Sequence, residues 1–323
     1  DMEEYAMAII AAMIKKLREI TGAGMMECKK ALTATDEDMD QAIEFLRKKG
    51  LAIAQKTVGR IASEGIVMLK VTDDCKKAVA IEVNTETDFV AKNEKFQSYV
   101  AKVCDQAIDT KAVDIEAFLA EPWKFDASKS VHEALAGQIS IIGENIKIRR
   151  FTRIEETNGF VATYTHMGGK IAVLVDVETD VVNDALKEMG KNIAMQVAAL
   201  NPLYISENEV PEEYIDHEKE IFFAQIKNDP KEFQKSEKVI EGMINGRIKK
   251  KLKEICLLNQ VYVKAEDGKH SVRKYISQIA KENSAKISVK RFIRWETGEG
   301  IEKKKEDFVS EVVKQMKQSI DRK

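Results

Sequence analysis

The segments Ile146-Lys-Ile-Arg-Arg-Phe-Thr-Arg-Ile-Glu155 and Ile287-Ser-Val-Lys-Arg-Phe-Ile-Arg-Trp-Glu296 align with each other without a gap. Both have the β-branched and aromatic content that is typical of strands. A repeat of this kind indicates a duplicated unit, and each segment is expected to close one copy of it. Matched fragments upstream of the two segments, in the same order, support this interpretation.

Two β-like runs joined by a polar turn lie upstream of each closing segment. β-Branched residues and short turns, one of which contains Gly168 and Gly169, are typical of β-hairpins. We therefore expect one hairpin in each copy, with strands over residues 64–71 and 78–83 in the first and residues 158–164 and 170–177 in the second.

The same three residues come after each hairpin, as Glu86-Thr-Asp88 in the first copy and Glu178-Thr-Asp180 in the second. An asparagine that could cap a helix comes next, Asn93 and Asn183 respectively, and helical periodicity follows it. Each copy is thus predicted to contain a strand hairpin, one or more helices and the closing strand. Helices that cover one face of a small antiparallel sheet make the fold class α+β.

Three segments lie outside this repeat. Helical patterns before it predict a compact three-helix unit, and residues 306–318 carry a helical pattern with one apolar face. An insertion in the second copy breaks at Pro230, which cannot continue a helix, so a protruding antiparallel helical hairpin is expected. The predicted plan is an expression remnant at 1–6, the three-helix unit at 7–57, core subdomains at 58–156 and 157–298, the hairpin insertion at about 206–258 and a C-terminal helical module at 299–323.

The overall charge of the chain is nearly balanced and does not favour a charged partner. The 323-residue chain has 52 Lys and Arg against 54 Asp and Glu, a formal net charge of -2, so nucleic acid or an anionic membrane would need a local basic patch. No apolar run reaches the ~18–20 residues of a membrane span, and the acidic amino terminus is unlike a transit peptide. Scattered cysteines without a CxxC pair are typical of a reducing compartment. We expect a soluble, cytoplasmic protein.

The chain lacks the motifs that bind phosphate, activate a serine or ligate a catalytic metal. Gly168-Gly-Lys170 resembles part of a phosphate loop, but the outer glycine and the hydroxyl residue of such loops are missing. The histidines are far apart in the sequence, and no pair of acidic residues stands out as a general acid and base. We therefore expect no enzymatic activity, no metal site and no cofactor.

The strongest basic segment is Arg247-Ile-Lys-Lys-Lys-Leu-Lys253, and such residues can contact phosphates. It has no interleaved aromatic residues, and the acidic stretch over residues 212–220 is expected to face it across the helical hairpin. A solvated helix face with charge pairs between the two helices is therefore favoured over a nucleic-acid surface.

The junction Asn84–Phe96 carries Phe89 and Val90 where a polar turn is expected. These side chains could plug the space between sheet and helix, or they could project toward a protein partner. At the place that the shared tripeptide makes equivalent, the second copy has Asp180-Val-Val-Asn183, which is two residues shorter and has no ring. The shared architecture does not require the ring, but the residues alone leave both interpretations open.

Two long motifs resemble signatures of the bacterial translation elongation factor Ts family. They are Leu17–Leu32, LREITGAGMMECKKAL, and Glu82–Lys92, EVNTETDFVAK. Residues 164–174 and 292–302 also match the family in place and order. Thr85 departs from the family, which often has cysteine or serine there. The resemblance extends from Met7 to essentially the carboxyl terminus.

This resemblance implies a guanine-nucleotide exchange factor for elongation factor Tu, with a UBA-like three-helix domain, two related core subdomains, an inserted coiled coil and a C-terminal helix. In the family, four adjacent positions disturb the Mg²⁺ and phosphate site of the GTPase, and the phenylalanine acts as a wedge. These positions correspond to Thr87, Asp88, Phe89 and Val90. Further partner contacts are implied for Met25, Met26 and His166.

The alternative function is a non-catalytic adaptor that binds other chains through the UBA-like domain. Direct binding of nucleotide, nucleic acid or membrane is not expected. Whether the free protein forms a homodimer stays open.

Overall fold

The computed structural model describes residues 2–303, with side chains from residue 9 onward. The predicted helix over residues 306–318, and with it most of the predicted C-terminal module, lies outside this range. The first helix begins at Met2, so the backbone of residues 2–6 continues the helix that the pattern after Met7 predicts. Among residues 2–303, no helix combines the length and apolarity needed to cross a membrane.

Three helices form the amino-terminal unit, as the sequence predicts: α1 (Met2–Thr21), α2 (Met25–Ala34) and α3 (Met39–Thr57). Gly22, with a positive φ of 69°, follows the end of α1 and separates it from α2. Asp38 begins α3 by accepting a hydrogen bond from the backbone of Gln41. Leu17 and Leu32 lie in a small separate core between the helices.

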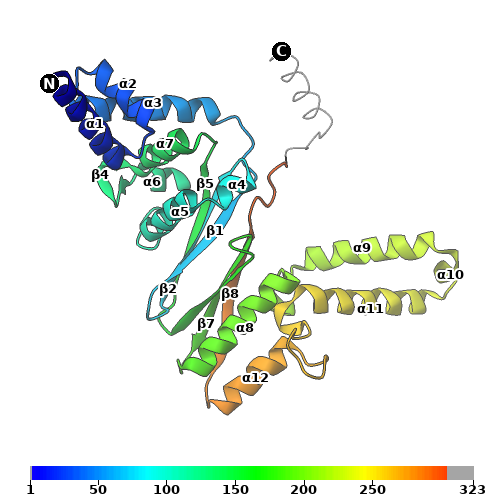
Figure 1. Cartoon of the computed structure of the whole chain (residues 1–323). Coiled ribbons are helices and arrows are strands. Elements are labelled where there is room, and N and C mark those ends of the chain that lie inside the picture. Colours follow the sequence, from blue (N-terminus) through cyan, green and yellow to red (C-terminus); the bar gives the residue numbers. More distant parts are fainter. Residues whose placement is uncertain (1, 304–323) are drawn as a thin grey trace.

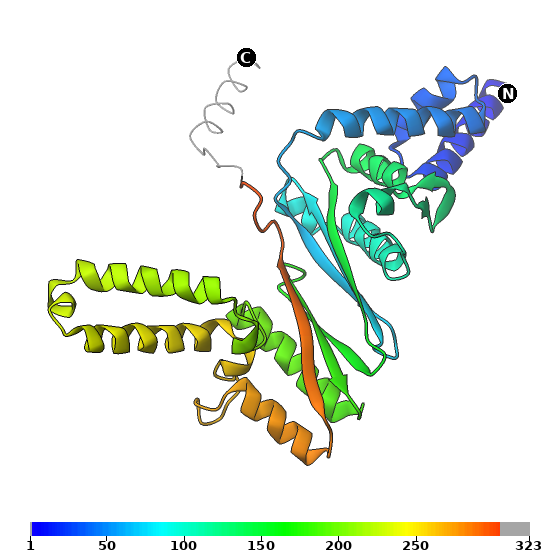
Figure 2. The same cartoon turned by 180° about the vertical axis from the view of Figure 1, so that it is seen from behind.

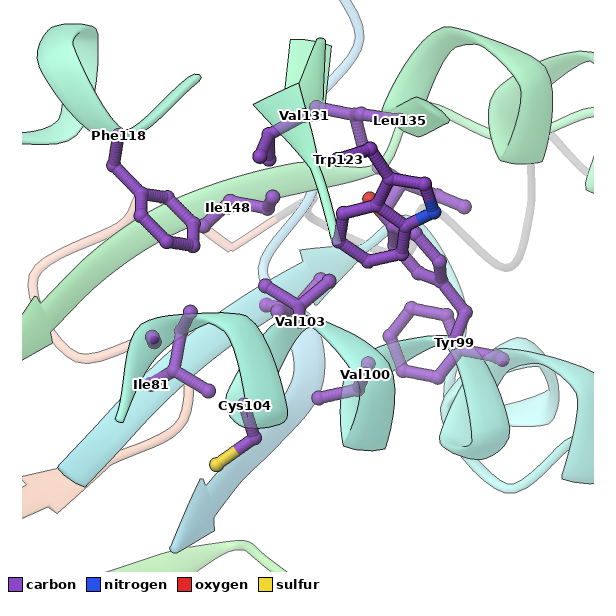
Figure 3. Close-up of a cluster of buried hydrophobic side chains, with 14 of the residues drawn as sticks. Ile81, Tyr99, Val100, Val103, Cys104, Phe118, Trp123, Val131, Leu135 and Ile148 are labelled. Carbon is purple, nitrogen blue, oxygen red and sulfur yellow. The ribbon is translucent and has the colours of Figure 1, made fainter. Parts of the chain in front are cut away.

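The first sheet has β2 in its centre, antiparallel to both neighbours. Its strands are β1 (Glu64–Val71), β2 (Lys77–Thr85) and β5 (Lys147–Glu155). One face is covered by α5 (Glu94–Ala107), α6 (Ile115–Ala120) and α7 (Val131–Ile142), with the small hairpin β3 (Pro122–Trp123) and β4 (Asp126–Ser130) beside α7. Figure 3 shows the core under these helices, where Ile81 and Ile148 of the sheet approach Val103 of α5.

The second sheet repeats this plan, with β7 in its centre. Its strands are β6 (Gly159–His166), β7 (Ile171–Thr179) and β8 (Ile287–Glu296). The helices α8 (Asp184–Leu200) and α12 (Val272–Glu282) cover its outer face. Val173, Val175 and Val177 lie in the core beneath them, because alternate residues of a strand point to the same face.

The two sheets pack against each other through the faces that the helices leave uncovered. Ala78, Ala80 and Leu174 lie in this interface, and Arg150 of β5 stacks over the ring of Trp295 at 4.4 Å. Figures 1 and 2 show the resulting order of layers, in which helices cover the outside of each sheet. The α+β class is confirmed, with N-terminal helices, small antiparallel sheets with packed helices and a closing C-terminal strand.

The pairing registers correct the predicted match between the two copies. The middle strand has a β-bulge at Glu82/Val83 in the first sheet and at Asp176/Val177 in the second, which makes Thr85 the counterpart of Thr179. Aligning Glu86-Thr-Asp88 with Glu178-Thr-Asp180 was therefore wrong by two residues, because this tripeptide recurs outside the strand register. Between the last strand residue and the helix cap lie seven residues (86–92) in the first copy and three (180–182) in the second.

Both bulges have a glycine on the neighbouring strand. Gly65 and Gly159 are equivalent in register, and each lies against the carbonyl of the bulged valine. A Cβ on Gly65 would lie 2.1 Å from the carbonyl oxygen of Val83, and one on Gly159 would lie 1.9 Å from that of Val177. The backbone approach at these points leaves no room for a side chain.

The first bulge carries the fully buried carboxylate of Glu82. It accepts hydrogen bonds from Arg150 Nε (2.6 Å), Arg149 Nη1 (3.1 Å), Asn84 Nδ2 (3.0 Å) and the backbone N–H of Gly298 (2.8 Å). Burial alone raises the pKa of Glu82, but these bonds and the Arg150 charge outweigh it, so its pKa lies below the ordinary value. The ionised carboxylate thus connects the segment after β8 to the first sheet.

The second bulge carries Asp176 in the equivalent place. Burial and a hydrogen bond with Glu156 raise the pKa of Asp176 to about 6, while Lys290 and Arg291 oppose this rise. Glu156 is ionised, since its pKa is lowered despite burial by the bonds from Asp176 and Lys290. Asp176 therefore holds a proton that it shares with Glu156 in the acidic range.

The insertion in the second copy is a helical hairpin with its predicted break at Pro230. It consists of η1 (Glu207–Glu209), α9 (Glu212–Asn228), α10 (Pro230–Phe233), α11 (Glu237–Ile255) and η2 (Leu257–Asn259). The predicted charge pairing is present in part. Lys251 pairs with Glu218 of α9 at 3.6 Å, but Arg247 pairs with Glu232 of α10 at 2.8 Å. Tyr204 and Cys256 pair through an isolated parallel β-bridge at the base of the hairpin.

Candidate partner-binding site

The junction after β2 forms a short helix that presents Phe89 to solvent. Thr87 caps α4 (Asp88–Ala91), and its hydroxyl accepts a hydrogen bond from the backbone of Val90 at 3.3 Å. Phe89 is 82% exposed, whereas Val90 is half-buried against the first core and Ala91 is buried. Of the two interpretations left open by the sequence, the plug applies to Val90 and the projecting side chain is Phe89.

A carboxylate from a distant part of the chain anchors this junction. Glu144, between α7 and β5, accepts hydrogen bonds from the hydroxyls of Thr85 (2.7 Å) and Thr87 (2.6 Å). It also accepts the backbone N–H groups of Glu86 and Thr87, both at 3.1 Å. Glu86 in turn accepts the backbone N–H of Asn145 at 2.7 Å. The sequence motifs did not single out Glu144, although the second copy has alanine at the matching position, Ala285.

Asp88 lies within a small group of alternating charges. Its carboxylate pairs with Lys92 at 2.7 Å, and Lys170 pairs with Glu64 of β1 at 3.0 Å. The pKa of Asp88 is lowered, first by the Lys92 hydrogen bond and further by the Lys92 and Lys170 charges. Asp88 is thus ionised at neutral pH, and the β6–β7 turn of the second copy contributes to its field.

The β6–β7 turn contains His166, for which a partner contact was predicted. His166 is exposed at the end of β6, and its Nδ1 is 3.0 Å from the hydroxyl of Tyr164. The next residue, Met167, is 72% exposed and has a left-handed backbone with φ 48°. Gly169 holds the turn against β1, where its carbonyl accepts the backbone N–H of Val67 at 2.8 Å. The structure therefore brings the turn that carries His166 close to the Asp88 charges.

Met25 and Met26 begin α2 and are 59% and 62% exposed. They lie on the amino-terminal unit, and Figures 1 and 2 show α2 well away from α4. The predicted contact residues thus form two separate surfaces, one around α4 and the β6–β7 turn and the other on α2.

Large apolar side chains held in the open by ordered backbone are typical of surfaces that bind another protein. Within the described part of the chain, no three His, Cys, Asp or Glu side chains gather so that they could hold a metal ion. The buried carboxylate of Glu82 is bound by two arginines, an asparagine and a backbone N–H of the fold itself. That of Asp176 lies 3.3 Å from Arg291 and shares a hydrogen bond with Glu156.

Comparison with known proteins identifies the family of this chain. The family model described as Elongation factor TS matches residues 86–299. The protein named Elongation factor Ts from Clostridium novyi is 47% identical over 310 residues, which cover 96% of this chain and 99% of that relative. Elongation factor Ts from Clostridium tetani is 46% identical over 308 residues, which cover 95% and 99%. The chain belongs to the elongation factor Ts family.

Proposed function

We propose that this protein is the guanine-nucleotide exchange factor of elongation factor Tu in translation elongation. It binds the GDP form of that GTPase, promotes release of GDP and leaves the site free for GTP. Exchange of this kind makes and breaks no covalent bond, so the protein is not an enzyme. The observation that carries the mechanism is the exposed Phe89 on a short helix whose other side chains are anchored.

Each residue of the α4 segment has a part in this proposal. Phe89 enters an apolar gap between helices of the GTPase and displaces the backbone that holds Mg²⁺ and phosphate. Asp88, ionised and half-exposed beside it, adds a negative charge near the metal site. Thr87 and Val90 fix the segment, the first as helix cap and the second by packing on the core.

The magnitudes require a larger interface than this segment. A GTPase that holds GDP at nanomolar affinity binds it with ~12 kcal/mol. Burial of one phenylalanine gains only ~1.5–3 kcal/mol. Contacts elsewhere must therefore supply the free energy that deforms the nucleotide site, and bound nucleotide must weaken binding of the factor to the same extent. We assign this part to Met25, Met26 and the turn at His166.

The remaining expectations from the family complete the proposal. The three N-terminal helices form a UBA-like domain over residues 7–57, α9 and α11 pair as a coiled coil within about 206–258, and residues 58–156 and 157–298 are the two core subdomains. The protein acts in the cytoplasm and needs no cofactor of its own. The alternating pairs between α11 and its neighbours favour a solvated face there over a nucleic-acid surface.

The test is the release of a fluorescent GDP from elongation factor Tu, with and without this protein. Phe89→Ala should leave the melting temperature unchanged, because the ring makes no core contact, and should slow stimulated release by ~10–200-fold. Phe233→Ala serves as the matched control, because it removes another half-exposed ring, at the tip of the hairpin. It should stimulate GDP release from elongation factor Tu at the normal rate.

An unchanged release rate with folded Phe89→Ala would remove the wedge from the mechanism. If the unsubstituted protein itself fails to accelerate release while it still binds other chains, the adaptor function is favoured. A steeply salt-dependent affinity for RNA, lost on substitution of residues 247–253, would instead favour nucleic-acid binding.

A further inference from the structure

We infer that Glu144 is a positioning residue for exchange, which holds α4 in the orientation that aims Phe89 at the partner. This inference rests on the proposed function and concerns a half-buried residue that lies behind the junction. Its carboxylate binds three consecutive residues of the junction, Thr85 to Thr87, immediately before α4.

The hydrogen-bond pattern explains how Glu144 can set the direction of the helix. Thr87 has a single hydroxyl hydrogen, which it donates to Glu144 Oε1 at 2.6 Å. Its lone pairs are then free to accept the backbone N–H of Val90 and cap α4. A four-residue helix is too short to be stable on its own, so its orientation depends on such anchors. Phe89 is two residues beyond the last group that Glu144 binds.

The second half of the molecule provides an internal control. In both halves a backbone N–H just before the closing strand donates to a carboxylate just after the middle strand, from Asn145 to Glu86 (2.7 Å) and from Lys286 to Asp180 (2.8 Å). The repeat places Ala285 at the position of Glu144, and the shorter junction there has neither the short helix nor an aromatic ring. The carboxylate is therefore present only in the half whose junction projects Phe89.

The burial of Glu144 is consistent with a positioning role. Its side chain is half-buried behind the junction, between the end of α7 and the buried Asn145. Asn145 extends the anchor further, because its side chain donates to the carbonyl of Arg60 at 2.7 Å. The segment that leaves the N-terminal helices, the junction before α4 and the start of β5 are thus joined at one point. An exchange factor gains from such preorganisation, since no ordering of α4 is then required on binding.

The experiment is a double-mutant cycle on stimulated GDP release from elongation factor Tu. Glu144→Ala gives this position the alanine of the second half. It should slow GDP release at least ~10-fold, which is the lower end of the slowing expected for Phe89→Ala. The same substitution in a Phe89→Ala background should change the rate by less than ~2-fold, because the ring that it positions is gone. Glu144→Gln keeps an acceptor oxygen and should stay within ~3-fold of the original rate.

A matched control and a direct readout separate positioning from general destabilisation. Glu121→Ala removes another half-buried carboxylate of the first half, which accepts hydrogen bonds from Gln106 and Thr110. This variant should stimulate GDP release at the normal rate. Amide hydrogen exchange at Glu86 and Thr87 should accelerate at least ~10-fold in Glu144→Ala, with β1 unchanged. This measurement needs no partner, and Thr85→Val offers a milder test if Glu144→Ala fails to fold.

Three outcomes would overturn the inference. They are normal release by Glu144→Ala, equal slowing by Glu144→Ala with and without Phe89, and unchanged amide protection at Glu86 and Thr87. Failure of the proposed function looks different, since the unsubstituted protein would then not accelerate GDP release at all, while the change in amide protection would still occur.

Discussion

The two sheets of this molecule share a strand order, a bulge in the middle strand and a glycine against that bulge, but they differ in the segment after the middle strand. In the first half, seven residues contain the capped four-residue helix α4 with its exposed ring. In the second half, three residues lead directly to the cap Asn183. Thr179 closes that shorter junction through its own hydroxyl, which bonds to Val181.

This difference separates requirements of the fold from requirements of function. Features present in both halves, such as Gly65 and Gly159, are needed to build the sheet. Features present in one half, such as Phe89 and Glu144, can be removed without loss of the architecture, because the other half exists without them. Substitutions that act on shared or unshared features should therefore differ in what they change.

The largest effect is expected at the shared glycines. Gly65→Ala and Gly159→Ala each place a Cβ about 2 Å from a backbone oxygen of the neighbouring strand, so the strands must separate. We expect a loss of ~3 kcal/mol or more in the free energy of unfolding, measured by urea denaturation. Gly137→Ala in α7, where a Cβ meets nothing within 4 Å, should stabilise by ~0.5–1 kcal/mol. Similar small effects at all three positions would contradict the shared requirement.

Glu82→Gln should give the next largest effect. The neutral amide leaves Arg149 and Arg150 without their partner, and we expect a loss of about 3 kcal/mol at pH 7. Because the pKa of Glu82 is lowered in the folded state, its contribution is present above ~4.5 and is lost as the pH falls through the folded value. Denaturation across pH 3–7 should show this loss in the original protein and not in the variant.

Asp176→Asn is expected to change the free energy of unfolding in the opposite direction, because the variant should be the more stable protein at neutral pH. The folded pKa of Asp176 is raised to about 6 from 3.8, so its stabilising contribution is full in acid and is lost as the pH rises through about 6. Asparagine can donate to Glu156 as the protonated acid does. The variant should be ~1–3 kcal/mol more stable at pH 7.5 and equal near pH 4. Destabilisation at pH 7.5 would mean that the ionised carboxylate of Asp176 is favourably paired in the folded protein, contrary to its raised pKa.

The smallest effect is expected for Lys92→Ala. Lys92 and Asp88 form an exposed ion pair on the surface of α4, and such pairs contribute little. The melting temperature should not change measurably, and stimulated GDP release should stay within ~2-fold of the original rate. A larger loss of release that disappears in high salt would show that Lys92 contacts the partner directly.

Much of this architecture was predictable, because alternation and repetition are local signals. The two hairpins, the closing strands, the three N-terminal helices and the break at Pro230 all derive from patterns within about twenty residues. The α+β class is then expected from helices that have one sheet face to cover. The family signatures around Phe89 supplied the partner.

The register and the anchors were not predictable, since both depend on contacts between distant residues. The recurrence of Glu-Thr-Asp suggested one alignment, and the bulges at Glu82 and Asp176 fix another. Exposure of Phe89 and burial of Val90 depend on how Glu144, more than fifty residues away, holds the junction. Nothing in the local sequence of a single glutamate indicates that it accepts four hydrogen bonds.

The bridge between Tyr204 and Cys256 has a consequence for engineering. Tyr204 precedes the hairpin insertion and Cys256 follows it, and the two residues pair in a β-bridge. Residues 205–255 therefore form a loop whose two ends are already held together. The entropy of closing such a loop grows only with the logarithm of its length. A foreign module with adjacent termini, inserted at α10, should therefore be accommodated without shifting the pairing of β7 with β8. The tip of the hairpin is therefore a suitable attachment point for a reporter, because it leaves the proposed contact residues on α2, on α4 and in the β6–β7 turn unchanged.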